Sequence, residues 1–103
     1  MIKVSVMYPN SEDAKFDLDY YCNTHIPLAV DLLGEALKKG EVDSGIAGAL
    51  PGEAPAFVAM THMTFDSVES FQGAFAPHAE KIMADLPNFT NIQPKIQISE
   101  IKI

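Results

Sequence analysis

The order of strand-like and helix-like stretches constrains this chain more than any other feature. Residues 2–8 place Ile2, Val4 and Val6 on one face, and this alternation of β-branched residues predicts a strand. Residues 56–65 are equally rich in β-formers and predict a second strand. A helix-like stretch and a further strand-like stretch follow each of them, so the order is β-α-β and again β-α-β.

The first helix-like stretch extends from Asp17, which can cap a helix N-terminus, to Gly40, which follows two lysines typical of a C-terminus. Pro27 lies inside this stretch and lacks a backbone N–H. We therefore expect a kink there, or a break at which Pro27 opens a second helical segment. Residues 42–50 then predict a strand that its glycines weaken.

The second helix-like stretch begins at Asp66. Together with Glu69, three residues later, Asp66 resembles a capping box. Pro77 restarts the helix, which we expect to end near Leu86. Residues 92–103 predict the last strand.

This order predicts a single α+β domain over residues 1–103, with ferredoxin-like βαββαβ topology and a four-stranded antiparallel sheet. Two helices cover only one face, yet Ile96 and Ile98 fall on one side of the last strand while Ile101 and Ile103 fall on the other. An apolar face of roughly 350 Å² is near the upper limit for a monomer. One interpretation is a half-exposed sheet that carries some threonine and alanine. We expect instead a homodimer, a dimeric α+β barrel in which two sheets enclose a shared interior.

Composition excludes several classes of partner. The 14 acidic residues outnumber the seven lysines, there is no arginine, and the net charge of -7 argues against nucleic acid and anionic membrane. We find no apolar run of about 20 residues and no signal peptide, and therefore expect no membrane partner and a cytoplasmic location. The single cysteine excludes an internal disulfide, and no motif predicts a metal or other cofactor.

His25 is the strongest chemical candidate. An imidazole can take or give a proton near neutral pH, and the irregularity expected at Pro27 could present this side chain to a cavity. The competing interpretation is a core histidine that bonds a backbone carbonyl. Tyr20 and Tyr21 add phenol groups at the same place, although each could equally be a core residue with one hydrogen bond. Cys22 is better explained as a buried inert thiol than as a nucleophile.

His62 and Met60 lie on one face of the predicted strand at 56–65. If that face lines the barrel interior, both are ligand-binding candidates; otherwise His62 is a partly buried structural residue. The three histidines fall on three elements without the spacing of metal ligands, so we expect no metal site.

Short motifs along nearly the whole chain resemble the EthD family, named for ethyl tert-butyl ether degradation. They are, in order, Tyr20-Tyr21, His25, Pro27-Leu28, Phe65-Asp66-Ser67, Asp85 and Pro87-Asn88-Phe89-Thr90. The resemblance implies a dimeric α+β barrel, a fold also used by small cofactor-free monooxygenases, muconolactone isomerase-like enzymes and polyketide cyclases. Carried over by position, it makes His25 the main catalytic candidate, with Tyr20, Tyr21 and Asp66 secondary.

We therefore expect an apolar barrel cavity that binds a small hydrophobic or aromatic molecule. His25, assisted by Tyr21 or Tyr20, would supply acid/base chemistry without a cofactor: dehydration, isomerisation, cyclisation or oxygenation. The class stays open between a cofactor-independent, monooxygenase-like oxidoreductase and a lyase or isomerase. His62, Asp66 and Met60 are the ligand-binding candidates. The alternative is a non-catalytic ligand-binding or accessory protein of a catabolic pathway.

Overall fold

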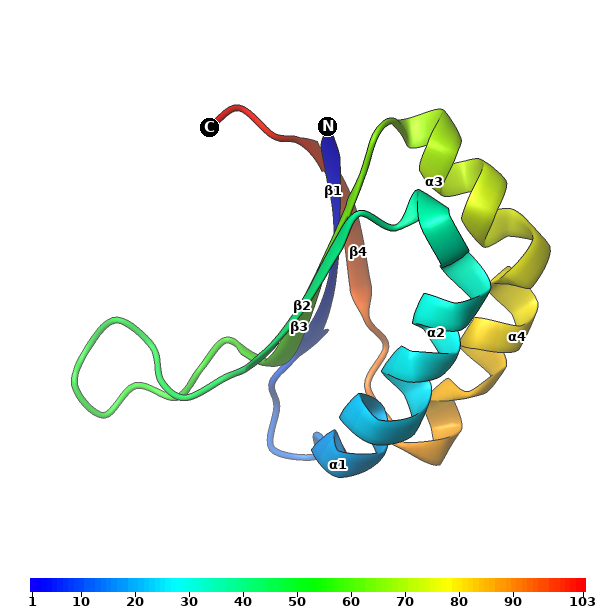
Figure 1. The fold of residues 1–103 in the computed structure, drawn as a ribbon. Helices are drawn as coiled ribbons and strands as arrows, with labels where there is room; N and C mark the ends of the chain where they lie inside the picture. Colours follow the sequence, from blue (N-terminus) through cyan, green and yellow to red (C-terminus); the bar gives the residue numbers. More distant parts are fainter.

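The computed structural model describes residues 1–103 and contains a four-stranded sheet with its helices on one face (Figure 1). The strands are β1 (Ile2–Pro9), β2 (Lys39–Ser44), β3 (Phe57–Phe65) and β4 (Lys95–Glu100). They follow the order β2-β3-β1-β4, and every neighbouring pair is antiparallel. This order confirms the predicted ferredoxin-like topology.

Two helical segments cover the sheet. The first contains α1 (Leu18–Tyr20), a π-helical turn (Tyr21–His25), α2 (Ile26–Leu33) and a 3₁₀ turn (Gly34–Ala36); the second contains α3 (Val68–Phe75), a 3₁₀ turn (Ala76–His78), α4 (Ala79–Ala84) and a 3₁₀ turn (Leu86–Asn88). None of these helices is long and apolar enough to cross a membrane.

The first helical segment ends earlier than predicted. Gly34 has φ = 61°, a left-handed conformation that favours glycine and ends α2 six residues before Gly40. Sheet pairing then begins at once, because the Lys38 N–H donates to the Thr64 carbonyl at 2.8 Å. The two lysines assigned to a helix C-terminus therefore lie at the start of β2.

The strand predicted at 42–50 is also shifted. β2 ends at Ser44, and Gly45 makes the last bond to β3, from its N–H to the Val58 carbonyl at 2.9 Å. A Cβ atom at Gly45 would lie only 2.2 Å from the Phe57 carbonyl oxygen, so the backbone crosses here where only glycine fits. Residues 45–56, which we call the arm, then leave the sheet on the side opposite the helices (Figure 1).

Ser67, not Asp66, caps α3. The Ser67 backbone is extended, and its hydroxyl oxygen accepts from the Ser70 N–H at 3.0 Å. Asp66 lies one residue outside the helix and is exposed, with its carboxylate 3.9 Å from the Lys38 ammonium. The predicted cap at Asp66 is therefore wrong by one residue, and the helix begins with a simple serine cap.

The buried core lies between the sheet and the helices and forms two clusters. One consists of Ile2, Val4, Leu33, Phe65 and Phe71, and the other of Tyr8, Tyr21, Ala59 and Phe89. Most of these strand residues alternate on the face that the helices cover, as the predicted pattern requires.

The outward face of the sheet is more polar than predicted. Cross-strand register gives three rows on this face: Lys39-Thr64-Lys3-Ser99, Glu41-His62-Ser5-Gln97 and Asp43-Met60-Met7-Lys95. Only the two methionines are apolar. β4 ends at Glu100, so Ile101 and Ile103 lie in the tail beyond it and do not form a second apolar face.

Candidate functional site

A wide helical turn places His25 over the sheet. The Ile26 N–H donates to the Tyr21 carbonyl, five residues back, which makes the turn π-helical. In an ordinary α-helix, the ring of Pro27 would clash with the carbonyl of Asn23. The wide turn removes this conflict, so the backbone stays helical through Ile26 (φ = −63°, ψ = −45°). Pro27 lies in the first turn of α2, as predicted for a second helical segment, although the helical backbone is not interrupted. Such π-helical turns occur frequently at functional sites.

Behind His25 lies Asp85, which follows α4 and accepts three side-chain hydrogen bonds. The donors are the Tyr20 hydroxyl at 2.7 Å, Nδ1 of His25 at 2.8 Å and the Asn88 amide at 2.9 Å. Burial raises the pKa of Asp85, but the hydrogen bonds from Asn88, His25 and Tyr20 outweigh it and hold this pKa below its ordinary value. Asp85 is therefore a carboxylate at neutral pH.

This carboxylate fixes the tautomer of the His25 imidazole. Because Asp85 can only accept, the proton of neutral His25 lies on Nδ1, and Nε2 carries a free lone pair. The residue is only 4% exposed, yet no fully buried polar side-chain atom in the structure lacks a partner. Nε2 makes no hydrogen bond within the protein, so it must have accessible surface, and His25 lines a cavity.

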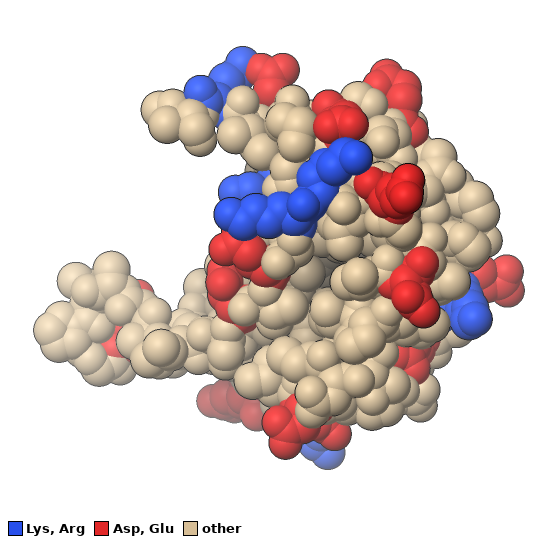
Figure 2. Space-filling model, in the orientation of Figure 1, with Lys and Arg blue, Asp and Glu red and all other residues tan.

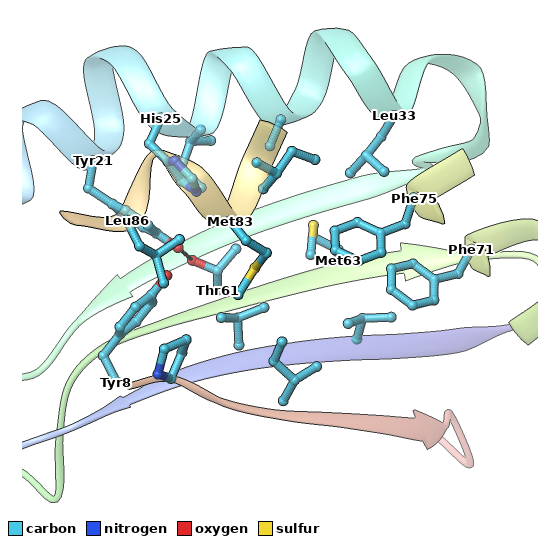
Figure 3. Close-up of a pocket in the computed structure, with 17 residues that line it drawn as sticks. Tyr8, Tyr21, His25, Leu33, Thr61, Met63, Phe71, Phe75, Met83 and Leu86 are labelled. Atoms are coloured by element: carbon cyan, nitrogen blue, oxygen red, sulfur yellow. Dashed lines mark hydrogen bonds between the residues drawn. The ribbon is translucent and has the colours of Figure 1, made fainter. Parts of the chain in front are cut away.

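The cavity lies between α2, α4 and the sheet and has a volume of about 220 Å³ (Figure 3). Fourteen of its 17 lining residues are hydrophobic, and none is Lys, Asp or Glu. Figure 3 shows His25 and Tyr21 entering from the helix, Thr61 and Met63 rising from β3, and Met83 and Leu86 closing the side. Such a lining suits an uncharged, largely apolar molecule.

A short hydrogen-bonded chain supplies the remaining polarity. The hydroxyls of Tyr21 and Thr61 lie 2.5 Å apart, and Tyr8 also lines this end of the cavity (Figure 3). Burial raises the pKa of Tyr21 and, together with the nearby Tyr21 phenol, that of Tyr8. Both phenols are therefore neutral hydrogen-bonding groups and not bases. The ring of Tyr21 also stacks on that of His25, with centroids 5.4 Å apart.

The predicted catalytic residues do not all face the cavity. His25 and Tyr21 line it, whereas Tyr20 lies behind Asp85 and does not. Hydrogen bonding to Asp85 raises the pKa of Tyr20. Cys22 is exposed, so the expectation of a buried thiol is wrong.

The predicted ligand-binding residues lie elsewhere. His62 and Met60 are on the outward face of the sheet, on the opposite side from His25, and Asp66 is in the exposed turn before α3. Nδ1 of His62 lies 2.8 Å from the Ser5 hydroxyl, and Nε2 lies 3.6 Å from the Asp43 carboxylate. This trio has the composition of a hydrolase triad, but Ser5 is on a central strand whose backbone amides pair on both sides. No free N–H pair there could stabilise an oxyanion.

Asp85 is the site residue that reasoning from the sequence did not identify. The signal for it was weak: a single aspartate 60 residues from His25, in a segment that reads as an irregular connection. Only the topology brings the end of α4 against the start of α2. The motif order quoted for the family resemblance contained Asp85 but gave it no role.

Comparisons with known proteins identify relatives of this chain by sequence and by fold. The EthD domain family profile matches residues 10–93. An EthD-like protein from Ralstonia eutropha JMP134 is 45% identical, with a TM-score of 0.95 over 99% of this chain and 92% of that one. An ethyl tert-butyl ether degradation (EthD) family protein from Bacillus halodurans C-125 is 24% identical, with a TM-score of 0.68 over 99% of both chains. No curated protein matches.

Proposed function

Because this chain belongs to the EthD domain family, and because its cavity holds one oriented imidazole, we propose that it binds a small neutral molecule and that His25 transfers a proton to or from it. One observation carries the proposal: Asp85 holds Nδ1 of His25 at 2.8 Å and leaves Nε2 to an apolar cavity. A base needs a defined tautomer and reach to the substrate, and this contact supplies the first while the cavity supplies the second.

The volume of the cavity limits the ligand. A cavity of roughly 150 Å³ lined by apolar residues holds benzene, which has six non-hydrogen atoms. By proportion, the cavity of about 220 Å³ suits roughly nine such atoms. A single aromatic ring with a short oxygen-bearing substituent has this size, and its oxygen could meet His25 or the Tyr21–Thr61 pair.

These groups support proton-transfer chemistry that needs no cofactor. The protonated His25 that forms after proton abstraction is stabilised by the Asp85 carboxylate, while the Tyr21 phenol can donate to a developing oxyanion. Dehydration, isomerisation, cyclisation and cofactor-free oxygenation share this first step. Tyr20 acts through Asp85 and is a positioning residue.

We also propose that the protein is a homodimer joined through the outward faces of its sheets. A protein from Bacteroides fragilis with a ferredoxin-like fold, 14% identical with a TM-score of 0.51, is described as dimeric. In this chain the arm and the tail beyond β4 both extend away from the helices and carry exposed isoleucines, Ile46 and Ile103 (Figure 1). A second copy would cover them.

Acetophenone, an enolisable single-ring ketone of nine non-hydrogen atoms, tests the proton transfer. We expect the protein to catalyse exchange of its methyl protons in D₂O, followed by NMR, and His25→Gln to slow this exchange by about 10²–10⁴-fold. His78→Gln, which changes a histidine outside the cavity, is the matched control. An unchanged rate in His25→Gln would remove His25 from this role.

The same experiment tests the alternative of an accessory protein. If acetophenone binds in the cavity and is recovered without exchange, the protein binds such molecules and does not transform them. The apolar lining supports binding under either function.

A further inference from the structure

The arm presents apolar residues to solvent in an ordered loop. Its tip, residues 45–52, contains no charged residue, and Ile46 and Leu50 are 92% and 66% exposed. The arm is nevertheless held in shape by bonds from Gly48 N–H to the Glu53 carbonyl at 2.8 Å and from Asn10 N–H to the Ala56 carbonyl at 2.9 Å. Figure 2 shows it projecting from the body as a lobe almost free of charged atoms. An ordered apolar projection of this kind is typical of a contact surface.

The His25 cavity has an apolar mouth that nothing in the protomer covers. Among its lining residues only Met83 and Ile96 are exposed, by 37% and 50%, and they mark an opening between α4 and the edge strand β4. A surface hollow shares Met83 and Leu86 with the cavity and is otherwise lined by Pro87 and residues 90–93. Its hydrophobic lining residues, Met83, Leu86 and Ile92, provide an apolar strip beside the cavity, while its other residues are mostly polar.

The register of the outward face indicates how a second copy would lie. Consider a twofold axis parallel to the strands between β1 and β3, with the two outward faces opposed. Each row of residues then faces the same row of the partner with the strand order reversed. Asp43 therefore opposes the partner's Lys95, and Met60 opposes the partner's Met7. Charges of opposite sign and the two methionines match, and no like charges meet.

This arrangement brings the arm to the mouth of the partner's cavity. Because the axis is parallel to the strands, the same ends of the two sheets lie together. The arm leaves its sheet at the end where β4 begins, so it lies near the start of the partner's β4. The axis also sets β2 of one copy against β4 of the other. Packed sheets lie about 10 Å apart. The arm can extend over about six residues before it turns back, which gives a reach of roughly 20 Å, enough to pass the edge of the partner's sheet.

We infer that the arm of one subunit covers the mouth of the other subunit's cavity, with Ile46 and Leu50 seated against the partner's Met83 and Ile96. The inference rests on the proposed dimer and cavity. Each site is then completed by the second copy, which excludes water from the ligand beside His25. Retention of the ligand then depends on dimerisation.

A cross-link tests this placement. In a Cys22→Ser background, Leu50→Cys combined with Met83→Cys should form a covalent dimer when oxidised by glutathione disulfide. Leu50→Cys combined with Gln72→Cys, which places the second thiol on exposed α3, should not. A dimer by light scattering in which the two pairs cross-link equally, or not at all, would overturn the placement of the arm and leave the dimer standing. A monomer would overturn both.

Ligand retention gives an independent measurement. Ile46→Ser with Leu50→Ser should weaken dimer association by about tenfold or more and accelerate acetophenone release, while the circular dichroism spectrum stays unchanged. If bound acetophenone has the same lifetime in this variant and in the parent, the arm does not cover the cavity.

Discussion

Replacing Asp85 by asparagine tests how far the site depends on a single carboxylate. Asp85 accepts from Tyr20, His25 and Asn88 at 2.7, 2.8 and 2.9 Å. An amide in its place can keep one oxygen toward Tyr20 and Asn88, but then turns an NH₂ group toward Nδ1 of His25. Nδ1 must become the acceptor, and the proton of the neutral ring moves to Nε2, where it blocks the lone pair that the cavity requires.

The expected cost follows from the charge that is lost. A hydrogen bond to a charged group contributes about 1.5–3 kcal/mol and a neutral one about 0.5–1.5 kcal/mol. With three bonds weakened and the carboxylate 13% exposed, we expect a loss of about 1–3 kcal/mol at pH 7, or about 4–8 °C in melting temperature for each kcal/mol. Proton transfer to acetophenone should slow by about 10²–10⁴-fold.

The effect should depend on pH with a definite sign. Because hydrogen bonds hold the pKa of Asp85 below its ordinary value, its stabilising effect is complete above the unfolded pKa of about 3.9 and is lost as the pH falls through the lower, folded pKa. The stability difference between parent and Asp85→Asn should therefore shrink in acid. Thermal unfolding at several pH values and ¹⁵N NMR of the His25 tautomer measure both effects, with exposed Asp31→Asn as control. A variant with the parent's tautomer and stability would refute this reasoning.

Four further substitutions have definite expected outcomes. Tyr20→Phe removes one donor to Asp85 and should raise the pKa of that carboxyl, seen as a smaller acid-dependent stability by unfolding titration. Ala29→Phe, at a buried position on the cavity wall, should abolish acetophenone binding by calorimetry while the fold, checked by circular dichroism, remains. Ser67→Ala should destabilise α3 by about 1 kcal/mol in denaturant unfolding, whereas Asp66→Ala should change stability by less than about 0.5 kcal/mol; equal effects would contradict the cap assignment.

The sequence predicted the sheet because its signals are local. The strands at 2–8 and 56–65 alternate clearly, and the element order restricts the topology to very few choices. The helix end was wrong because Gly34 and Gly40 are both plausible stops, and only pairing of Lys38 with Thr64 decides between them. Such a tertiary contact has no local signature.

The site was harder to predict for a related reason. His25 and Tyr21 stand out in the sequence, and Pro27 marks an irregular turn beside them. The cavity, however, lies between sheet and helices within one protomer, whereas the expected barrel interior lay on the other face, which carries His62 and Met60. Which apolar face keeps a void depends on how side chains from five separate segments pack.

The proposed function requires a small aromatic molecule to bind beside Nε2 of His25. Crystals soaked with a panel of single-ring aromatic ketones and phenols test this claim. We predict electron density for a ring in the cavity of about 220 Å³, with its oxygen about 2.6–3.2 Å from Nε2. Rings found only on the outward face near His62, with the cavity empty, would contradict the claim.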